Sequence, residues 1–279
     1  MSTLAELPPL REALAAHGLL AKKSFGQHFL LDLNVTRKIA RLSGAAEGTA
    51  VIEVGPGPGG LTRALLETGA VVIAVEKDAR FVPLLAELAA AAAGRLTVVQ
   101  ADALEADEPA LLSTAGAAGL PARIVANLPY NVSVPLLVKW LRQGRRWESL
   151  TLMFQKEVAD RITAAADTPD YGRLSVIAQA CARAETVMAL PARAFTPPPK
   201  VDSAVVRLTP REDAPAPELL AALERVTQAA FGQRRKMLRS SLKSLGGEAL
   251  CAAAGVDPGL RAEAVGIEGF LGLARATRA

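Results

Sequence analysis

The chain has 279 residues, of which 51% are hydrophobic and 22% are charged, an ordinary composition for a globular protein that folds in water. Its length accommodates one large domain and a smaller one. The N-terminus carries Glu6, Pro8 and Arg11 where a signal peptide would need an apolar run, and the longest uncharged stretch is too short and too polar to span a bilayer. We therefore expect a cytoplasmic protein.

Histidine and cysteine are scarce in the chain. Two histidines leave little room for a Ser-His-Asp hydrolase, and the absence of CxxC and HxxxH spacings argues against a metal site. Cys181 and Cys251 lie in apolar or alanine-rich surroundings, which favours two buried free thiols over a disulfide.

The basic residues are clustered, although the net charge of +4 is too small to identify a nucleic-acid-binding protein. Residues 226–247 contain no acid but several basic side chains, namely Arg234, Arg235, Lys236, Arg239 and Lys243. Such a cluster suits a phosphate backbone. Taken alone, it could equally be the solvated face of an ordinary helix.

In chain order, short β-rich runs alternate with helical stretches, the pattern of an open parallel sheet. Strands are predicted over residues 50–54, 71–75, 96–99, 123–126 and 150–154, and helices over residues 60–68, 79–93, 132–142 and 157–163. Residues 185–189 and 203–208 are predicted to be a closing strand pair. The pattern indicates an α/β domain with a Rossmann-like, doubly wound sheet over residues 1–210.

The rest of the chain is predicted to be helical. Residues 211–217 carry two prolines and three charges, as expected of a linker. Leu219, Leu220, Leu223 and Val226 follow at helical spacing. We therefore expect residues 211–279 to form a small all-α domain.

A glycine-rich loop follows the first predicted strand and opens a helix. Gly55, Gly57 and Gly60 satisfy the GxGxxG pattern, in which glycines let the backbone approach a ligand closely. Glu76 ends the second strand, the expected place for a carboxylate that binds ribose hydroxyls. Together they indicate a cofactor that contains adenosine, without identifying which one.

Two further features select among such cofactors. Asp102 follows the third strand, where a carboxylate can accept from an adenine amine, and Asn127-Leu-Pro-Tyr130 follows the fourth. Ligands of doubly wound sheets bind at the carboxyl ends of the strands, so these residues should converge on one crevice. We find no acid or base suited to a hydride-transfer site. S-adenosylmethionine is therefore favoured over a nicotinamide dinucleotide.

The Asn127–Tyr130 tetrapeptide suits methyl transfer to an adenine amine, a nitrogen whose lone pair is delocalised into the ring. The side-chain oxygen of Asn127 and the backbone carbonyl of Leu128 can accept the two amine hydrogens and draw the nitrogen toward a reactive, tetrahedral geometry. Pro129 fixes the turn, and Tyr130 can stack on the base. The target base must leave its stack to reach such a pocket.

Several ordered motifs resemble the bacterial small-subunit rRNA adenine dimethyltransferases, the KsgA or RsmA family, across nearly the whole chain. The motifs that carry the resemblance are Lys23-Ser-Phe-Gly-Gln-His-Phe-Leu30, Glu53-Val-Gly-Pro-Gly57, Asn127-Leu-Pro-Tyr-Asn131, Met153-Phe-Gln-Lys-Glu-Val158, Tyr171-Gly-Arg-Leu-Ser175, Phe195-Thr-Pro-Pro-Pro-Lys-Val-Asp-Ser203 and Phe231-Gly-Gln-Arg-Arg-Lys236.

The resemblance implies a class I methyltransferase that dimethylates two adjacent adenines in a hairpin near the 3′ end of 16S rRNA, late in small-subunit assembly. It implies a cofactor site lined by His28, Leu30, Gly55, Glu76, Asp102 and Asn127. His28 stands where some members have Asn, and either side chain can form hydrogen bonds. Phe195 is expected to clamp the target adenine together with Tyr130.

The resemblance also implies that Arg234, Arg235 and Lys236 contact rRNA phosphates. The expected partner is 16S rRNA within the small subunit or its precursor, and we expect a monomer. A purely structural role stays open for some of the motif residues. Phe25, Phe29 and Phe195 could be core residues, and Tyr171 could simply order the sheet edge.

Other functions share part of this pattern. A macrolide-resistance (Erm-type) methyltransferase of large-subunit rRNA has the same catalytic motifs, but the 195–203 and 231–236 stretches favour the small-subunit family. An assembly factor that binds RNA without turnover would not need Glu76, Asp102 and the 127–130 tetrapeptide intact. The glycine loop alone would also permit a nicotinamide-dependent oxidoreductase.

Overall fold

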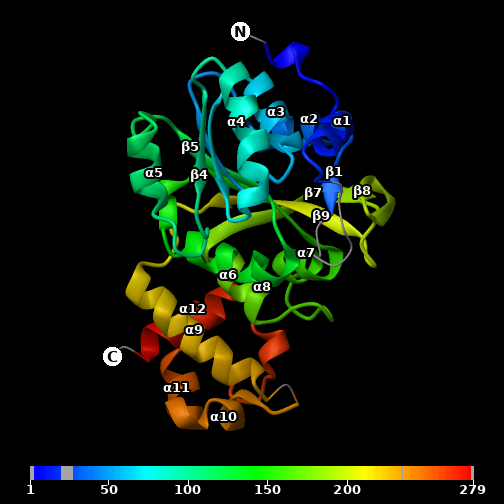
Figure 1. Cartoon of the computed structure of the whole chain (residues 1–279). Helices are drawn as coiled ribbons and strands as arrows, with labels where there is room; N and C mark the ends of the chain where they lie inside the picture. Colours follow the sequence, from blue (N-terminus) through cyan, green and yellow to red (C-terminus); the bar gives the residue numbers. More distant parts are fainter. Residues whose placement is uncertain (1–2, 20–27, 234, 278–279) are drawn as a thin grey trace. The chain divides into compact units, whose positions relative to one another are not determined.

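The computed structural model describes residues 3–19, 28–233 and 235–277 (Figure 1). The chain divides into two compact units. Unit 1 contains Met1–Leu136, Arg146–Lys156 and Val187–Arg207, and unit 2 contains Leu137–Arg145, Glu157–Thr186 and Leu208–Ala279.

The central element is a seven-stranded sheet with the strand order β4-β3-β2-β5-β6-β9-β7. Its strands are β2 (Ala50–Val54), β3 (Val71–Glu76), β4 (Leu96–Gln100), β5 (Ala122–Asn127), β6 (Ser149–Gln155), β7 (Ala182–Leu190) and β9 (Ser203–Pro210). Every strand predicted from the sequence is present, and the predicted closing pair lies side by side at one edge. The α/β, doubly wound fold class is thereby confirmed.

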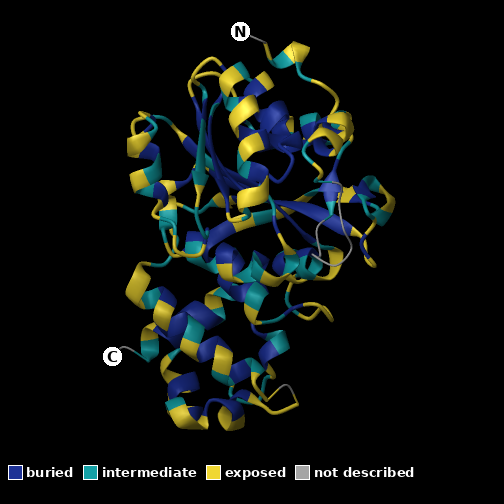
Figure 2. Ribbon diagram, in the orientation of Figure 1, coloured by how far each residue is buried: buried dark blue, intermediate teal, exposed yellow. Residues whose placement is uncertain are grey.

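The strands from β4 to β6 pair in parallel, with β2 at the point where the strand order reverses. All residues of β2 are buried, and the strands at the centre of the sheet are dark blue in Figure 2, whereas β4 is mostly half-buried. A strand that is covered on both faces has no solvent-exposed side, which is why β2 is rich in Val and Ile, with Glu53 as its one polar residue. The order reversal makes the carboxyl end of β2 the place where a ligand crevice is expected.

Short helices precede or connect these strands in unit 1. They are α1 (Leu10–Ala16), α2 (Leu33–Ser43), α3 (Gly60–Glu67), α4 (Val82–Ala91) and α5 (Glu108–Thr114), with 3₁₀ turns at Leu4–Glu6, Ala79–Phe81 and Ala192–Ala194. Helix α2 begins at an Asp32 side chain that accepts from the Asn34 amide, and it ends at Gly44 in the left-handed conformation. Helices α2 and α3 pack against each other.

The helix predicted over residues 79–93 is shorter in the structure. The Asp78 side chain caps a 3₁₀ turn by accepting from the Arg80 amide, and the α-helix starts only at Val82. It ends at Ala91, after which Ala93 has a φ of 50°. The run of alanines favours a helix, but the left-handed turn at its end stops it two residues early.

A second, two-stranded sheet was not expected from the sequence. Strand β1 (Phe29–Leu30) pairs antiparallel with β8 (Phe195–Thr196), so that Leu30 lies opposite Phe195. This pairing joins the N-terminal motif to the 195–203 motif, two segments far apart in the chain.

The remaining elements lie in unit 2 or run into it. They are α6 (Tyr130–Leu141), α7 (Lys156–Thr163), α8 (Arg173–Cys181), α9 (Pro217–Phe231), α10 (Leu238–Ser241), α11 (Gly247–Ala253) and α12 (Ile267–Ala276), with 3₁₀ turns at Gly144–Arg146, Lys243–Leu245 and Ala262–Ala264. Helix α9 buries Leu220, Leu223 and Val226 on one face, as their spacing predicts.

Cys181 and Cys251 are buried free thiols, as predicted. Burial raises the pKa of the Cys181 thiol to about 12, so this group stays protonated at neutral pH. Within the described ranges, none of the helices has the length and apolar character needed to cross a membrane.

Candidate active site

A cavity of about 670 Å³ lies in unit 1 where β2, β3 and β5 end. It is lined by His28, Phe29, Leu30, Glu53, Gly55, Pro56, Gly57, Pro58, Gly60, Leu61, Glu76, Lys77, Asp78, Phe81, Asn127, Leu128, Pro129, Tyr130, Asn131 and Phe195. All the cofactor-site and catalytic residues named from the sequence are among them except Asp102. The structure therefore brings those residues together at the sheet edge where they were expected.

The glycine loop between β2 and α3 forms one wall of the cavity. Gly57 has a φ of 53°, a left-handed conformation that residues with a Cβ rarely adopt. At Gly60 the limit is space, because a Cβ there would lie 2.8 Å from the Leu30 carbonyl oxygen. The glycines thus let the loop turn sharply and let β1 pass close to the start of α3.

Glu76 is held in place by the backbone of two loops. Its Oε2 accepts from the Gly57 amide at 3.0 Å, and its Oε1 accepts from the Asp78 amide at 2.8 Å. Burial raises the pKa of this carboxyl, while the backbone amides of Asp78 and Gly57 oppose the rise. Each oxygen retains a second lone pair, so the carboxylate can still accept from a pair of hydroxyl groups.

Glu53 is a cavity residue that the sequence analysis did not assign. It is 1% exposed, and its Oε2 forms no hydrogen bond with any described residue. Burial raises its pKa to about 8, with opposition from the neighbouring Thr62. The sequence signal was an acidic residue inside the fully buried strand β2, where an uncompensated carboxylate is costly.

Asn127 ends β5, and its side-chain orientation is fixed by the backbone of residue 28, just before β1. Its Nδ2 donates to the His28 carbonyl oxygen at 3.4 Å. Because the nitrogen is engaged on that side, the side-chain oxygen is left to accept from a ligand. Leu128, the next residue, is buried, and α6 begins at Tyr130.

His28 and Tyr130 form the aromatic part of the cavity wall. The Nδ1 of His28 lies 2.8 Å from the Pro197 carbonyl oxygen, which can only accept, so Nδ1 carries the proton. The two rings are stacked with centroids 6.2 Å apart. The Tyr130 hydroxyl is hydrogen-bonded to Ser203 Oγ at 2.9 Å, which fixes the ring.

Phe29 and Phe195 combine two roles that the sequence analysis treated as alternatives. Both are buried, Phe29 edge-on to Phe81 and Phe195 in the hydrophobic core beside Leu30. Both also line the cavity. A core position therefore does not exclude contact with a ligand.

Asp102 lies beside the cavity rather than in its wall. Its Oδ2 accepts from Lys77 Nζ at 2.8 Å, and its Oδ1 accepts from the Leu104 amide at 2.9 Å. Lys77 itself lines the cavity. The lysine is a second residue that the sequence analysis did not single out.

The residues proposed for RNA contact lie in unit 2. Arg235 and Lys236 are exposed in the turn between α9 and α10, whereas Arg234 lies outside the described residues.

Tyr171, another motif residue, is structural: its hydroxyl donates to the Val265 carbonyl oxygen at 2.8 Å, and its ring packs edge-on against Phe231.

Comparisons with known proteins identify the family of the chain that carries this site. A sequence model described as "Ribosomal RNA adenine dimethylase" matches residues 18–277. A protein of Phenylobacterium zucineum named "Ribosomal RNA small subunit methyltransferase A" is 69% identical over 274 residues, which cover 98% of this chain and 94% of the relative. A protein of Rhodospirillum rubrum with the same name is 57% identical over 275 residues, which cover 98% and 93% of the two chains.

Solved structures agree with the sequence matches. A dimethyladenosine transferase from Plasmodium falciparum is similar with a TM-score of 0.73 and 26% identity, covering 88% of this chain and 96% of that one. The 23S rRNA methyltransferase ErmE is similar with a TM-score of 0.67 and 28% identity, covering 90% and 100%. Both the expected resemblance and the expected enzyme class are confirmed, and this chain belongs to the ribosomal RNA adenine dimethylase family.

Proposed function

We propose that the chain transfers methyl groups from S-adenosylmethionine to the exocyclic amines of two adjacent adenines in a hairpin near the 3′ end of 16S rRNA. The observation that carries this proposal is the meeting of the glycine loop, Glu76 and the Asn127–Tyr130 turn in one cavity. The relatives named small-subunit methyltransferases support a 16S target, since ErmE is only 28% identical. We place the reaction in the cytoplasm, on the small subunit or its precursor, with the chain acting as a monomer.

The cavity fits a nucleoside methyl donor. Glu76 presents a fixed carboxylate to the ribose hydroxyls, and the unpaired Oε2 of Glu53 suits an ammonium group. When bound, S-adenosylmethionine supplies an electrophilic methyl group on its sulfonium. The other contacts that we propose for it are His28, Leu30, Gly55, Gly57, Asp102 and Asn127.

Two acceptors of the turn hold the target amine. Asn127 uses its side-chain oxygen, whose direction follows from the hydrogen bond of its Nδ2 to the His28 carbonyl. Leu128 uses its backbone carbonyl. Together they draw the two amine hydrogens into positions that expose the nitrogen lone pair, and Tyr130 and Phe195 clamp the ring. Stacking of a base on an aromatic side chain contributes roughly 1–3 kcal/mol.

Positioning is the main catalytic contribution of the protein. A well-aligned in-line attack can account for on the order of 7–11 kcal/mol of the barrier. The proton of the methylated amine is acidic enough to leave without a dedicated base. The scarcity of histidine in the chain is consistent with this mechanism.

We propose that residues 211–279 form the rRNA-binding domain and residues 1–210 the catalytic domain. The exposed Arg235 and Lys236 of unit 2, with Arg234, supply cations for RNA phosphates.

The test is to incubate the protein with a tritiated methyl donor and small subunits that lack adenine dimethylation, in parallel with large subunits, and then to map the label. We expect label on the adjacent adenines near the 3′ end of 16S rRNA. Label confined to large-subunit RNA would favour the Erm-type activity. RNA binding without any label would favour a non-catalytic assembly factor.

A further inference from the structure

Helix α1 packs behind two aromatic residues of the cavity wall. Its Leu14 is 1% exposed and belongs to a hydrophobic cluster with Phe29 and Phe81. Both aromatic residues line the cavity, whereas α1, whose residues are all described, contributes no residue to the lining. The two rings therefore separate the helix from the cavity, and Figure 1 shows α1 next to β1, the strand of Phe29.

Both ends of α1 are tied to other helices of unit 1. Just before the helix, the Pro8 carbonyl oxygen accepts from Arg63 Nη1 of α3 at 2.7 Å. Directly after the helix, His17 Nε2 lies 3.0 Å from Glu87 Oε1 of α4. The helix is thus held at both ends, with Leu14 between the two anchors.

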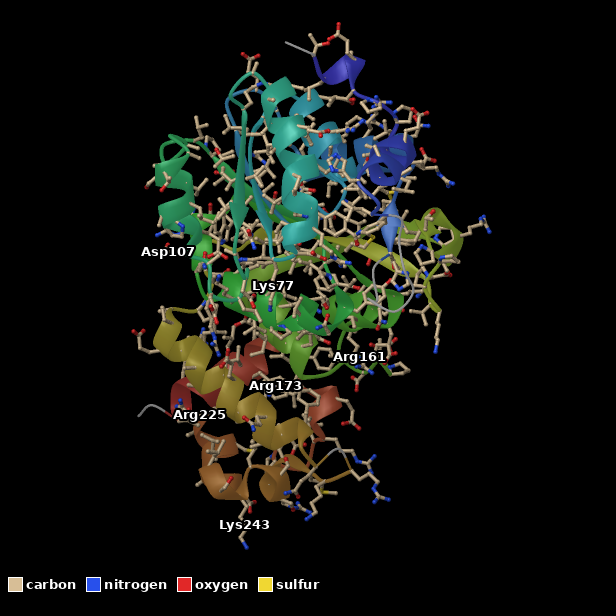
Figure 3. The ribbon with its side chains drawn as sticks, in the orientation of Figure 1. Lys77, Asp107, Arg161, Arg173, Arg225 and Lys243 are labelled. Carbon is tan, nitrogen blue, oxygen red and sulfur yellow. The ribbon has the colours of Figure 1, made fainter. Side chains whose placement is uncertain are left out.

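Phe29 and Phe81 connect α1 to the part of the cavity that contains Glu76. The two rings meet edge-on with their centroids 5.6 Å apart. Cε1 of Phe29 lies 3.3 Å from the place where a Cβ of Gly57 would stand, and the Gly57 amide donates to Glu76 Oε2. Phe81 belongs to the connection from β3 to α4, which also contributes Lys77 to the cavity wall (labelled in Figure 3). A continuous line of contacts leads from α1 to the carboxylate that we propose for the ribose.

We infer that Leu14 is a positioning residue of the donor site, which acts through Phe29 and Phe81 and sets the affinity for the nucleoside part of the donor. This inference rests on the proposed function, because it takes the cavity as the donor site. The Leu14 side chain packs against the two rings and holds them in one arrangement. A shorter side chain leaves a void behind the rings, so they spend part of their time in arrangements that do not fit the ligand.

We expect Leu14→Ala to raise the Kd of S-adenosylhomocysteine about five- to ten-fold, which corresponds to a fitting arrangement occupied about 10–20% of the time. Methylthioadenosine should lose affinity by the same factor, because it keeps the nucleoside and lacks only the amino-acid part. Leu14→Met restores nearly the same volume and should bind both ligands like the unmodified protein.

Isothermal titration of both ligands into the whole protein and its variants, well below the melting temperature of each, measures these constants. Leu112→Ala is the matched control, since Leu112 of α5 is 5% exposed in the same unit and does not line the cavity. It removes the same atoms from a buried position and should leave both affinities unchanged. If Leu14→Ala fails to fold, the milder Leu14→Val takes its place, with a rise in Kd of at least about two-fold.

The outcomes separate this inference from the proposed function. An unchanged Kd in a folded Leu14 variant would overturn the inference while leaving the proposed donor site intact. An equal loss in Leu112→Ala would also overturn it, because general destabilisation would then explain the effect. A loss for S-adenosylhomocysteine alone would contradict the route through Gly57 and Glu76. If the unmodified protein binds neither ligand, the proposed function itself fails.

Discussion

Asn127 illustrates how a single side chain in this site is given one orientation. The carbonyl oxygen of His28 accepts from its nitrogen, which leaves the side-chain oxygen of Asn127 to accept from an adenine amine. The neighbouring acceptor at position 128 belongs to the backbone and does not depend on side-chain type. These two positions therefore respond differently to substitution.

We predict that Asn127→Ala lowers the rate of methyl transfer at least 100-fold while donor affinity falls less than about five-fold, because the variant loses an interaction made mainly in the transition state. Leu128→Met is the control, since it keeps the carbonyl and nearly the same volume. Single-turnover methylation and titration of S-adenosylhomocysteine measure the two effects. Full activity in Asn127→Ala would refute the mechanism.

The protonation state of Glu53 should be linked to the binding of the proposed methyl donor. Its pKa of about 8 in the free protein means that the carboxyl is largely protonated at pH 7. The ammonium group of the proposed donor, placed beside Glu53, favours the ionised form of this carboxyl. Ligand binding should therefore release a proton. Affinity should then rise as the pH approaches about 8 and level off above that value.

Titrating S-adenosylhomocysteine at pH 7 in buffers of different ionisation enthalpy measures this release. We expect the binding enthalpy to vary with the buffer for the unmodified protein and not for Glu53→Gln. Methylthioadenosine, which lacks the ammonium, is the matched ligand control. A buffer-independent enthalpy with S-adenosylhomocysteine would contradict the linkage.

At the scale of elements, the loop between β2 and α3 shows why close packing matters. We predict that Gly60→Ala destabilises the protein by about 1–3 kcal/mol, because the new Cβ would crowd the Leu30 carbonyl oxygen and force a shift. Gly119→Ala, where nothing lies within 4 Å, should change stability little. Urea denaturation of both variants measures the difference in the free energy of unfolding. Equal stability of the two variants would show that β1 shifts to accommodate the new Cβ without destabilising the protein.

Strands and connections differ in how well the sequence predicts them. The Val- and Ile-rich runs of β2 and β3 predict buried strands clearly. The order of the motifs along the chain then places Glu76 and Asn127 at the same edge of the sheet. Helix α2 carries helix-start and helix-stop residues, Asp32 and Gly44, that the sequence analysis did not use. The β1–β8 pair could not be foreseen, since two residues per strand carry no periodic signal.

The features of the candidate site likewise divide into those that the sequence predicts and those that it does not. Residues at strand ends were predictable, because parallel strands end at one edge. The contacts among them depend on distances that only the folded backbone sets. The hydrogen bond from Gly57 to Glu76, the unpaired Glu53 oxygen and the Lys77–Asp102 pair are of this kind.

At the scale of the whole molecule, the proposed RNA contacts and the donor cavity fall in different compact units. We predict that Arg235→Ala with Lys236→Ala weakens small-subunit binding and lowers the salt slope by about 1.4–1.8, the loss of two phosphate contacts. S-adenosylhomocysteine affinity should be unchanged. Arg225→Ala, on the exposed face of α9, is the control, and filter binding over a salt series measures the slope. An unaltered slope in the double variant would remove these residues from the RNA surface.

The contact between Asn127 and residue 28 has an evolutionary consequence. The amide is anchored by a main-chain oxygen, so the anchor survives whichever side chain position 28 carries. Histidine and asparagine can therefore exchange there without reorienting the Asn127 amide that we propose for catalysis. The side chain at position 28 can then change the wall of the cavity while the orientation of the Asn127 amide stays the same.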